Sequence, residues 1–127
     1  MNLIREGRNY GWGPSETCST PPSPPQNTNQ DGPSPVLPKL WFTPTIAPVG
    51  AAFCVGCGLT QSEGTLFFGS YNDDDISRVV MTAQRKGIVS ATVVYRHPAS
   101  IFSVERGPDQ ALYFSSADGG IYKLVNT

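Results

Sequence analysis

The sequence carries little charge and no long apolar run. Only 15% of its 127 residues are charged, and nine Lys and Arg nearly balance ten Asp and Glu. Such a composition offers no basic surface for nucleic acid, so we expect no nucleic-acid partner. No apolar stretch approaches the roughly 20 residues that a membrane-spanning helix needs. Residues 1–6 also lack the apolar core of a signal peptide. We therefore expect no membrane span and no export signal within the 127 residues.

Histidine and cysteine are also scarce, with one His and three Cys. We expect His97, which precedes Pro98 in a predicted turn, to be a surface residue rather than a general base, because a base needs an orienting partner. Cys54 and Cys57 have the Cys-x-x-Cys spacing of zinc half-sites and redox pairs. Only Cys18 and His97 could complete a zinc site. A structural disulfide is favoured if the protein is exported, with one cysteine left over.

Glycine and proline are abundant instead, with 13 and 12 residues. This favours a turn-rich β protein over a helical one. Eight prolines fall between Pro14 and Pro38, separated mainly by Ser, Thr, Asn and Gln. Proline lacks the amide donor that a helix interior or a central strand requires. We therefore expect residues 14–38 to form a long surface loop, polyproline-like in places.

Two segments of the chain repeat each other. Residues 65–70 (TLFFGS) resemble 111–116 (ALYFSS), and after a polar turn residues 76–80 (ISRVV) resemble 121–125 (IYKLV). The offset is 46 residues for the first pair and 45 for the second. A period in this range, with short strands and polar turns, is typical of a β-propeller blade. One blade cannot bury both faces, so the repeat predicts a part of a larger object.

Turn residues divide the chain after Trp41 into seven predicted strands. They cover about residues 49–55, 65–70, 76–82, 88–95, 100–105, 111–115 and 120–125. Blades have four strands, so the seven divide as four plus three. We predict an all-β partial β-propeller of about two four-stranded antiparallel blades, the last lacking one strand. Residues 1–13 would end a preceding blade, 39–96 would form one blade, and 97–127 the incomplete one.

The incomplete blade predicts an open sheet edge after residues 120–125. Either a strand from a missing N-terminal portion completes this edge, or the object is not a closed propeller. A bare edge would also make self-association through the sheets plausible.

Three adjacent carboxylates occupy residues 73–75 (DDD). Carboxylate oxygens could contribute to a calcium site. In the repeat, however, residues 118–120 (DGG) occupy the same place, and Asp favours turns. The repeat therefore favours a solvated turn between strands.

Several motifs together resemble the PQQ-dependent glucose/sorbosone dehydrogenases. Residues 2–12 contain the pattern NLI…G.NYGW, and residues 44–50 (PTIAPVG) resemble the family motif P[ST][IV]AP.G. The segments LFFGS at 66–70, GPD at 107–109 and IYKL at 121–124 follow in the family's order. The resemblance covers nearly the whole chain apart from the proline-rich loop.

The resemblance implies a six-bladed propeller that binds PQQ over the mouth of its central channel, with calcium ions helping to bind it. The implied activity is oxidation of an aldose sugar, in which a histidine base takes the hydroxyl proton and hydride passes to the quinone. The chain would be the C-terminal part of such a protein. The family's histidine and calcium ligands would precede the NLI segment. A periplasmic or secreted location is implied as well.

Two residues of the chain are expected to contact the cofactor by this resemblance. Thr45 matches the Ser/Thr of the family motif, and Trp41 lies near the aromatic positions that precede it, although Thr43 directly precedes Pro44. The alternative for Trp41 is that it packs, with Phe42, against a neighbouring blade. No catalytic or metal-binding residue is expected in this chain.

The cationic residues of the family's cofactor site are mostly replaced. Ser100 and Phe102 stand where arginines are expected before the GPD turn, and Asn72 stands near an expected lysine. Arg96 or Arg106 could substitute only if the loops bend differently. We therefore expect a glucose/sorbosone dehydrogenase-like fragment that is inactive alone. The alternative is a non-catalytic propeller module for binding or scaffolding, with a decayed cofactor site.

Overall fold

The computed structural model describes residues 1–10, 36–42, 44 and 46–127. The described residues contain seven β-strands and no helix. The strands are β1 (Pro48–Phe53), β2 (Leu66–Ser70), β3 (Asp75–Met81), β4 (Ile88–Arg96), β5 (Ile101–Arg106), β6 (Leu112–Ser116) and β7 (Ile121–Lys123). Each strand predicted from the sequence is present, with its ends within two residues of the expected ones. The all-β prediction is confirmed.

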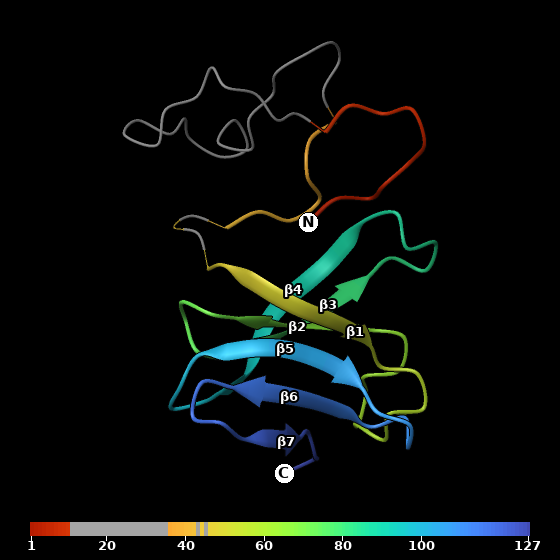
Figure 1. Cartoon of the computed structure of the whole chain (residues 1–127). Coiled ribbons are helices and arrows are strands. Elements are labelled where there is room, and N and C mark those ends of the chain that lie inside the picture. The colour runs from red at the N-terminus through yellow and green to blue at the C-terminus, as the bar shows by residue number, and fades with distance from the viewer. Residues whose placement is uncertain (11–35, 43, 45) are drawn as a thin grey trace. The chain divides into compact units, whose positions relative to one another are not determined.

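The strands form two antiparallel sheets, one of four strands and one of three (Figure 1). The first sheet has the order β1-β2-β3-β4, and the second has the order β5-β6-β7. Within each sheet, strands that are consecutive in sequence pair with each other, as short polar turns between strands dictate. The predicted division into four plus three strands is confirmed. In Figure 1, β7 forms the lower edge of the three-stranded sheet.

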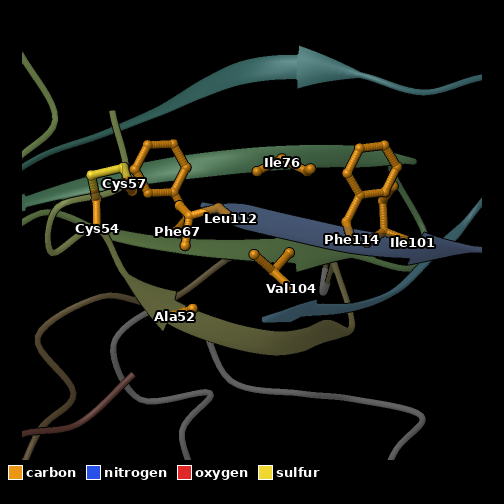
Figure 2. Close-up of a cluster of buried hydrophobic side chains, with 9 residues drawn as sticks. All are labelled: Ala52, Cys54, Cys57, Phe67, Ile76, Ile101, Val104, Leu112 and Phe114. Carbon is orange, nitrogen blue, oxygen red and sulfur yellow. A yellow bond between two sulfur atoms is a disulfide. The ribbon is translucent and has the colours of Figure 1, made fainter. Parts of the chain in front are cut away.

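The two sheets enclose one apolar core (Figure 2). Phe67 of β2 and Ile76 of β3 face Leu112 and Phe114 of β6, with Val104 of β5 between them. The exposed fraction of each of these five side chains is 3% or less. Because strand residues alternate between faces, the apolar residues at every second position of the repeat supply this core from both sheets.

Two glycines let the first sheet approach β5 closely. A Cβ atom on Gly69 of β2 would overlap the side chain of Ile101, and one on Gly50 of β1 would overlap the backbone of Val104. Gly50 also has a φ of 36°, and the register of β1 and β2 shifts between Val49 and Ala51. A glycine is needed at such a bulge because L side chains rarely adopt this φ.

Residues 1–10, 36–42 and 44 belong to a separate unit, Met1–Pro44. Asn9 C=O accepts a hydrogen bond from Val36 N–H at 2.8 Å, and Met1 C=O accepts one from Lys39 N–H at 2.9 Å. Residues 1–10 contain no strand, and the expectation that residues 1–13 end a preceding blade stays a prediction. Residues 14–35 of the expected proline-rich loop lie outside the described residues, and residues 36–38 contain no helix or strand.

Candidate functional site

Of the two residues expected to contact the cofactor, the structure describes Trp41 but not Thr45. Trp41 lies in the first unit, before β1 begins, and 43% of its surface is exposed. Thr45 and Thr43 lie outside the described residues. The pair Trp41 and Thr45 therefore stays a prediction. Trp41 is not part of a strand, and its alternative role in packing against a neighbouring blade also stays a prediction.

The arginines that could replace the family's cationic residues are engaged elsewhere. Arg96 Nη1 lies 3.6 Å from the carboxylate of Asp75, and Arg106 Nη1 donates to Val55 C=O at 3.4 Å. Phe102, at an expected arginine position, stacks on Tyr71 with ring centroids 6.0 Å apart. Both arginines thus have partners within the described part of the chain.

Of the three adjacent aspartates at residues 73–75, the first two lie in a turn and the third begins β3. Asp75 begins β3 and is buried, and burial raises its pKa although the nearby Arg96 guanidinium acts to lower it. Within the described part of the chain, no three His, Cys, Asp or Glu side chains are placed to hold a metal ion. The turn interpretation accounts for Asp73 and Asp74, which precede β3.

His97 contradicts its predicted place at the surface. It follows β4 directly, and only 4% of its side chain is exposed. Its Nε2 lies 2.9 Å from Oδ2 of Asp118, and its Nδ1 lies 3.1 Å from the hydroxyl of Tyr95. A carboxylate only accepts hydrogen bonds, so Nε2 donates to Asp118. The imidazole also contacts the rings of Phe114 and Tyr122, with centroids 5.2 and 4.7 Å away.

The environment of Asp118 stabilises its charged form. Gly120 N–H donates to Oδ1 at 2.9 Å, and Tyr122 hydroxyl donates to Oδ2 at 2.8 Å. The Gly120 N–H, followed by His97 and Tyr122, lowers the pKa of Asp118 to about 2. The hydrogen bond between the Tyr122 hydroxyl and Asp118 raises the pKa of Tyr122. The cluster therefore holds a carboxylate that stays ionised, and it occupies both ring nitrogens of the histidine.

A second Asp–Tyr pair stands at the preceding turn. Tyr113 hydroxyl donates to Asp109 Oδ2 at 2.9 Å, and Lys123 Nζ donates to the same oxygen at 2.9 Å. These bonds, the Lys123 one first, lower the pKa of Asp109. Each pair has the spacing Asp-x-x-x-Tyr. The Asp precedes the strand and the Tyr lies within it, in β6 for the first pair and in β7 for the second. This spacing is visible in the sequence and was the signal for the role of Asp118 that the sequence analysis did not use.

The Cys-x-x-Cys segment is a disulfide rather than half of a zinc site. Cys54 and Cys57 are bonded, with their Cα atoms 5.0 Å apart. Both belong to the buried core, with exposed fractions of 1% and 7%, and Figure 2 shows the bond beside Phe67. The bond uses the two thiolates that a zinc ion would need. Cys18 lies outside the described residues.

A cavity of about 660 Å³ opens between the two sheets. Its walls include Phe67 and Arg78 from the four-stranded sheet and Phe114 and Tyr122 from the three-stranded one. Tyr95 of β4 lines it as well, so the cavity adjoins the His97 cluster. The sequence does not predict this cavity, because it arises from the packing of one sheet on the other.

A family model for glucose/sorbosone dehydrogenase matches residues 1–123. The chain belongs to this family. The match covers the GPD turn, the PTIAPVG segment and all but the last two residues of the repeat. No curated protein sequence matches this chain.

Solved structures of this family's fold agree with the architecture. One described as "Crystal structure of glucose dehydrogenase" has a TM-score of 0.77 and 22% sequence identity. The match covers 99% of this chain and 38% of the chain in that structure. A second, described as "glucose dehydrogenase", has a TM-score of 0.76 and 22% identity, over 99% and 36%. The chain thus spans less than two fifths of the structures it matches. The fold is a partial β-propeller of two blades, the second lacking one strand.

None of the described residues belongs to a helix long and apolar enough to cross a membrane.

Proposed function

We propose that this chain supplies two blades to the propeller of a dehydrogenase that oxidises an aldose sugar with PQQ. Family membership supports the dehydrogenase, and the observation that assigns this chain a scaffold role is the enclosure of its single histidine. His97 has both ring nitrogens engaged and a nearly buried side chain, so it is unavailable to take a substrate proton. The chain therefore acts as scaffold, and the reactive groups belong to other parts of the whole protein.

The cofactor assignment rests on family membership. PQQ would supply the oxidising quinone, with calcium helping to bind it. In this proposal Trp41 and Thr45 would contact PQQ from the segment before β1. Residues 39–96 and 97–127 would be the two blades, and residues 1–13 would end a preceding one. In this proposal the charge of the PQQ carboxylates would be balanced mainly outside these two blades.

A periplasmic or secreted location is part of the same proposal. Disulfides persist in oxidising compartments and are rare in the cytosol. The buried bond between Cys54 and Cys57 supports such a location.

The proposal is tested by assaying the purified chain with PQQ, Ca²⁺, glucose and a reducible dye. We expect no dye reduction above the protein-free blank, while a complete glucose dehydrogenase in the same assay is active. Sustained turnover by the chain alone would refute the proposal, because it would require a base that His97 cannot provide.

The alternative is a non-catalytic propeller module, favoured by one observation. Ser100 and Phe102 replace expected arginines, while Arg96 and Arg106 are engaged with Asp75 and Val55. The reading frame upstream of Met1 separates the two. A continuation that encodes a histidine base and a calcium loop favours the dehydrogenase, whereas its absence favours the module.

A further inference from the structure

Tyr95 and His97 are joined by a hydrogen bond whose direction is set by Asp118. His97 Nε2 donates to Asp118 Oδ2 at 2.9 Å, so in the neutral imidazole the other nitrogen, Nδ1, is an acceptor. The Tyr95 hydroxyl lies 3.1 Å from Nδ1 and therefore donates to it. The phenol, the imidazole and the carboxylate thus form one chain of hydrogen bonds that all run in the same direction.

This chain of hydrogen bonds gives the Tyr95 hydroxyl a prepared proton acceptor. Imidazole is a stronger base than a carboxylate. The Asp118 carboxylate beside it stabilises the imidazolium that forms when the ring takes a second proton. Only 4% of the His97 side chain is exposed, so water has little access to that proton. A proton that leaves Tyr95 therefore stays within the cluster.

Two other tyrosines of the sheets donate to carboxylates instead. Tyr122 donates to Asp118, whose pKa is about 2. Tyr113 donates to Asp109, whose pKa is also lowered, first by the hydrogen bond from Lys123. A carboxylate with a lowered pKa is a weak proton acceptor. Of these three tyrosines, Tyr95 is the one whose hydroxyl donates to a base strong enough to keep its proton.

The strength of this base matters for the oxidation of a tyrosine. A phenol that loses one electron becomes strongly acidic at its hydroxyl. It is therefore oxidised most easily where a base accepts the proton in the same step. The hydrogen bond from Tyr95 to His97 Nδ1 provides this arrangement, and the carboxylate acceptors of Tyr113 and Tyr122 provide it less well.

We propose that Tyr95, His97 and Asp118 form a proton-coupled redox site that reduces one-electron oxidants such as oxygen-centred radicals. The oxidant takes one electron from Tyr95 and becomes an anion. The Tyr95 O–H bond breaks, and its proton bonds to His97 Nδ1. Tyr95 is left as a neutral phenoxyl radical, and the imidazolium is paired with the Asp118 carboxylate. The dehydrogenase function proposed above gives these groups no chemical step, so the redox site is tested separately from it.

The first test locates the oxidised tyrosine in the unaltered chain. Photogenerated ruthenium(III) tris(bipyridine) is the oxidant, a nitroso spin trap captures the radical, and tandem mass spectrometry locates the adduct. We expect Tyr95 to be labelled in preference to Tyr71 and Tyr113. Tyr71 is the matched control for accessibility, because its exposed fraction is 46% and that of Tyr95 is 40%. Labelling of Tyr71 or Tyr113 equal to that of Tyr95, or no labelling of Tyr95, would overturn the proposal.

The second test measures how fast the tyrosyl radical forms after a laser flash. Tyr95→Phe should remove the fastest phase, and Tyr113→Phe should leave it unchanged. His97→Gln keeps a hydrogen-bond donor and an acceptor but lacks the basic nitrogen. We expect it to slow radical formation about a hundredfold, the lower end of the range for proton transfer to a positioned base.

The His97→Gln variant also separates a redox role from a purely structural one. A structural role would change the stability of the variant and leave the rate of radical formation as it is. A folded His97→Gln chain that forms the radical as fast as the unaltered chain would therefore overturn the proposal. If the variant does not fold, the position of the adduct in the unaltered chain decides the question alone.

Discussion

His97 and Asp118 join the two blades through one hydrogen bond. His97 follows the last strand of the four-stranded sheet, Asp118 lies in the turn between β6 and β7, and 2.9 Å separates Nε2 from Oδ2. Tyr95 from the first sheet and Tyr122 from the second bond to the same pair. The cluster thus links the outer strands of adjacent blades, whereas the apolar core links their inner strands.

Removal of the His97 side chain should destabilise the contact between blades. His97→Ala removes two hydrogen bonds and three aromatic contacts from a nearly buried site. We expect the free energy of unfolding to fall by about 3 kcal/mol, measured by urea titration with far-ultraviolet circular dichroism. Lys123→Met, which breaks the exposed pair with Asp109, is the control and should have little effect. Similar losses in both variants would contradict the role of His97.

The stability of the chain should depend on the charge of Asp118 at low pH. Its folded pKa of about 2 lies below the ordinary aspartate value of 3.8, so its contribution is complete above pH 3.8 and is lost as the pH falls toward 2. Asp109 acts in the same direction, while the raised pKa of Asp75 acts in the opposite one.

Asp118→Asn should therefore flatten the dependence of the urea midpoint on pH between about 4 and 2. Asp75→Asn should change the profile only above about pH 3.8, because the raised pKa of Asp75 places its opposing contribution there. Identical pH profiles for Asp118→Asn and the unaltered chain would show that this carboxylate does not govern acid stability.

Gly69 should not tolerate even one added methyl group. In Gly69→Ala the new Cβ overlaps Ile101 and lies 3.1 Å from Val49 Cγ2, both in packed strands. We expect a loss of roughly 1–3 kcal/mol in unfolding free energy, the range for an overpacked core. Gly87→Ala meets only Thr82 at 3.3 Å and serves as the matched control. A Gly69→Ala variant as stable as the control would mean that β2 and β5 are farther apart.

The disulfide between Cys54 and Cys57 should be detectable by thiol counting. The denatured, unreduced chain should titrate one thiol and the reduced chain three, since the sequence holds three cysteines. Cys54→Ala with Cys57→Ala should lower the unfolding free energy by about 2 kcal/mol, the chain-entropy value for so short a loop. Three titratable thiols before reduction, in protein kept under oxidising conditions, would contradict the bond.

The strands, their order and the deficit of one strand could be predicted from the sequence. The physical reason is local: alternating apolar residues, Gly and Asp turns and short connections determine which strands form and that neighbours pair. The repeat between residues 65–80 and 111–125 carried the same information twice. Residues 1–10 were less predictable, because their apolar residues do not alternate in a way that distinguishes a strand from an irregular chain.

The environments of His97 and Arg78 were decided only by the tertiary structure. Beside a proline, His97 looks like a surface turn residue, yet the packing of two sheets encloses it and brings Asp118, 21 residues away, to its ring. Arg78 belongs to an apolar strand whose inner face becomes a cavity wall only when β6 and β7 lie opposite. Local patterns determined this protein's strands and their shortage, but burial and charge pairing depend on contacts between sheets, which no single segment contains.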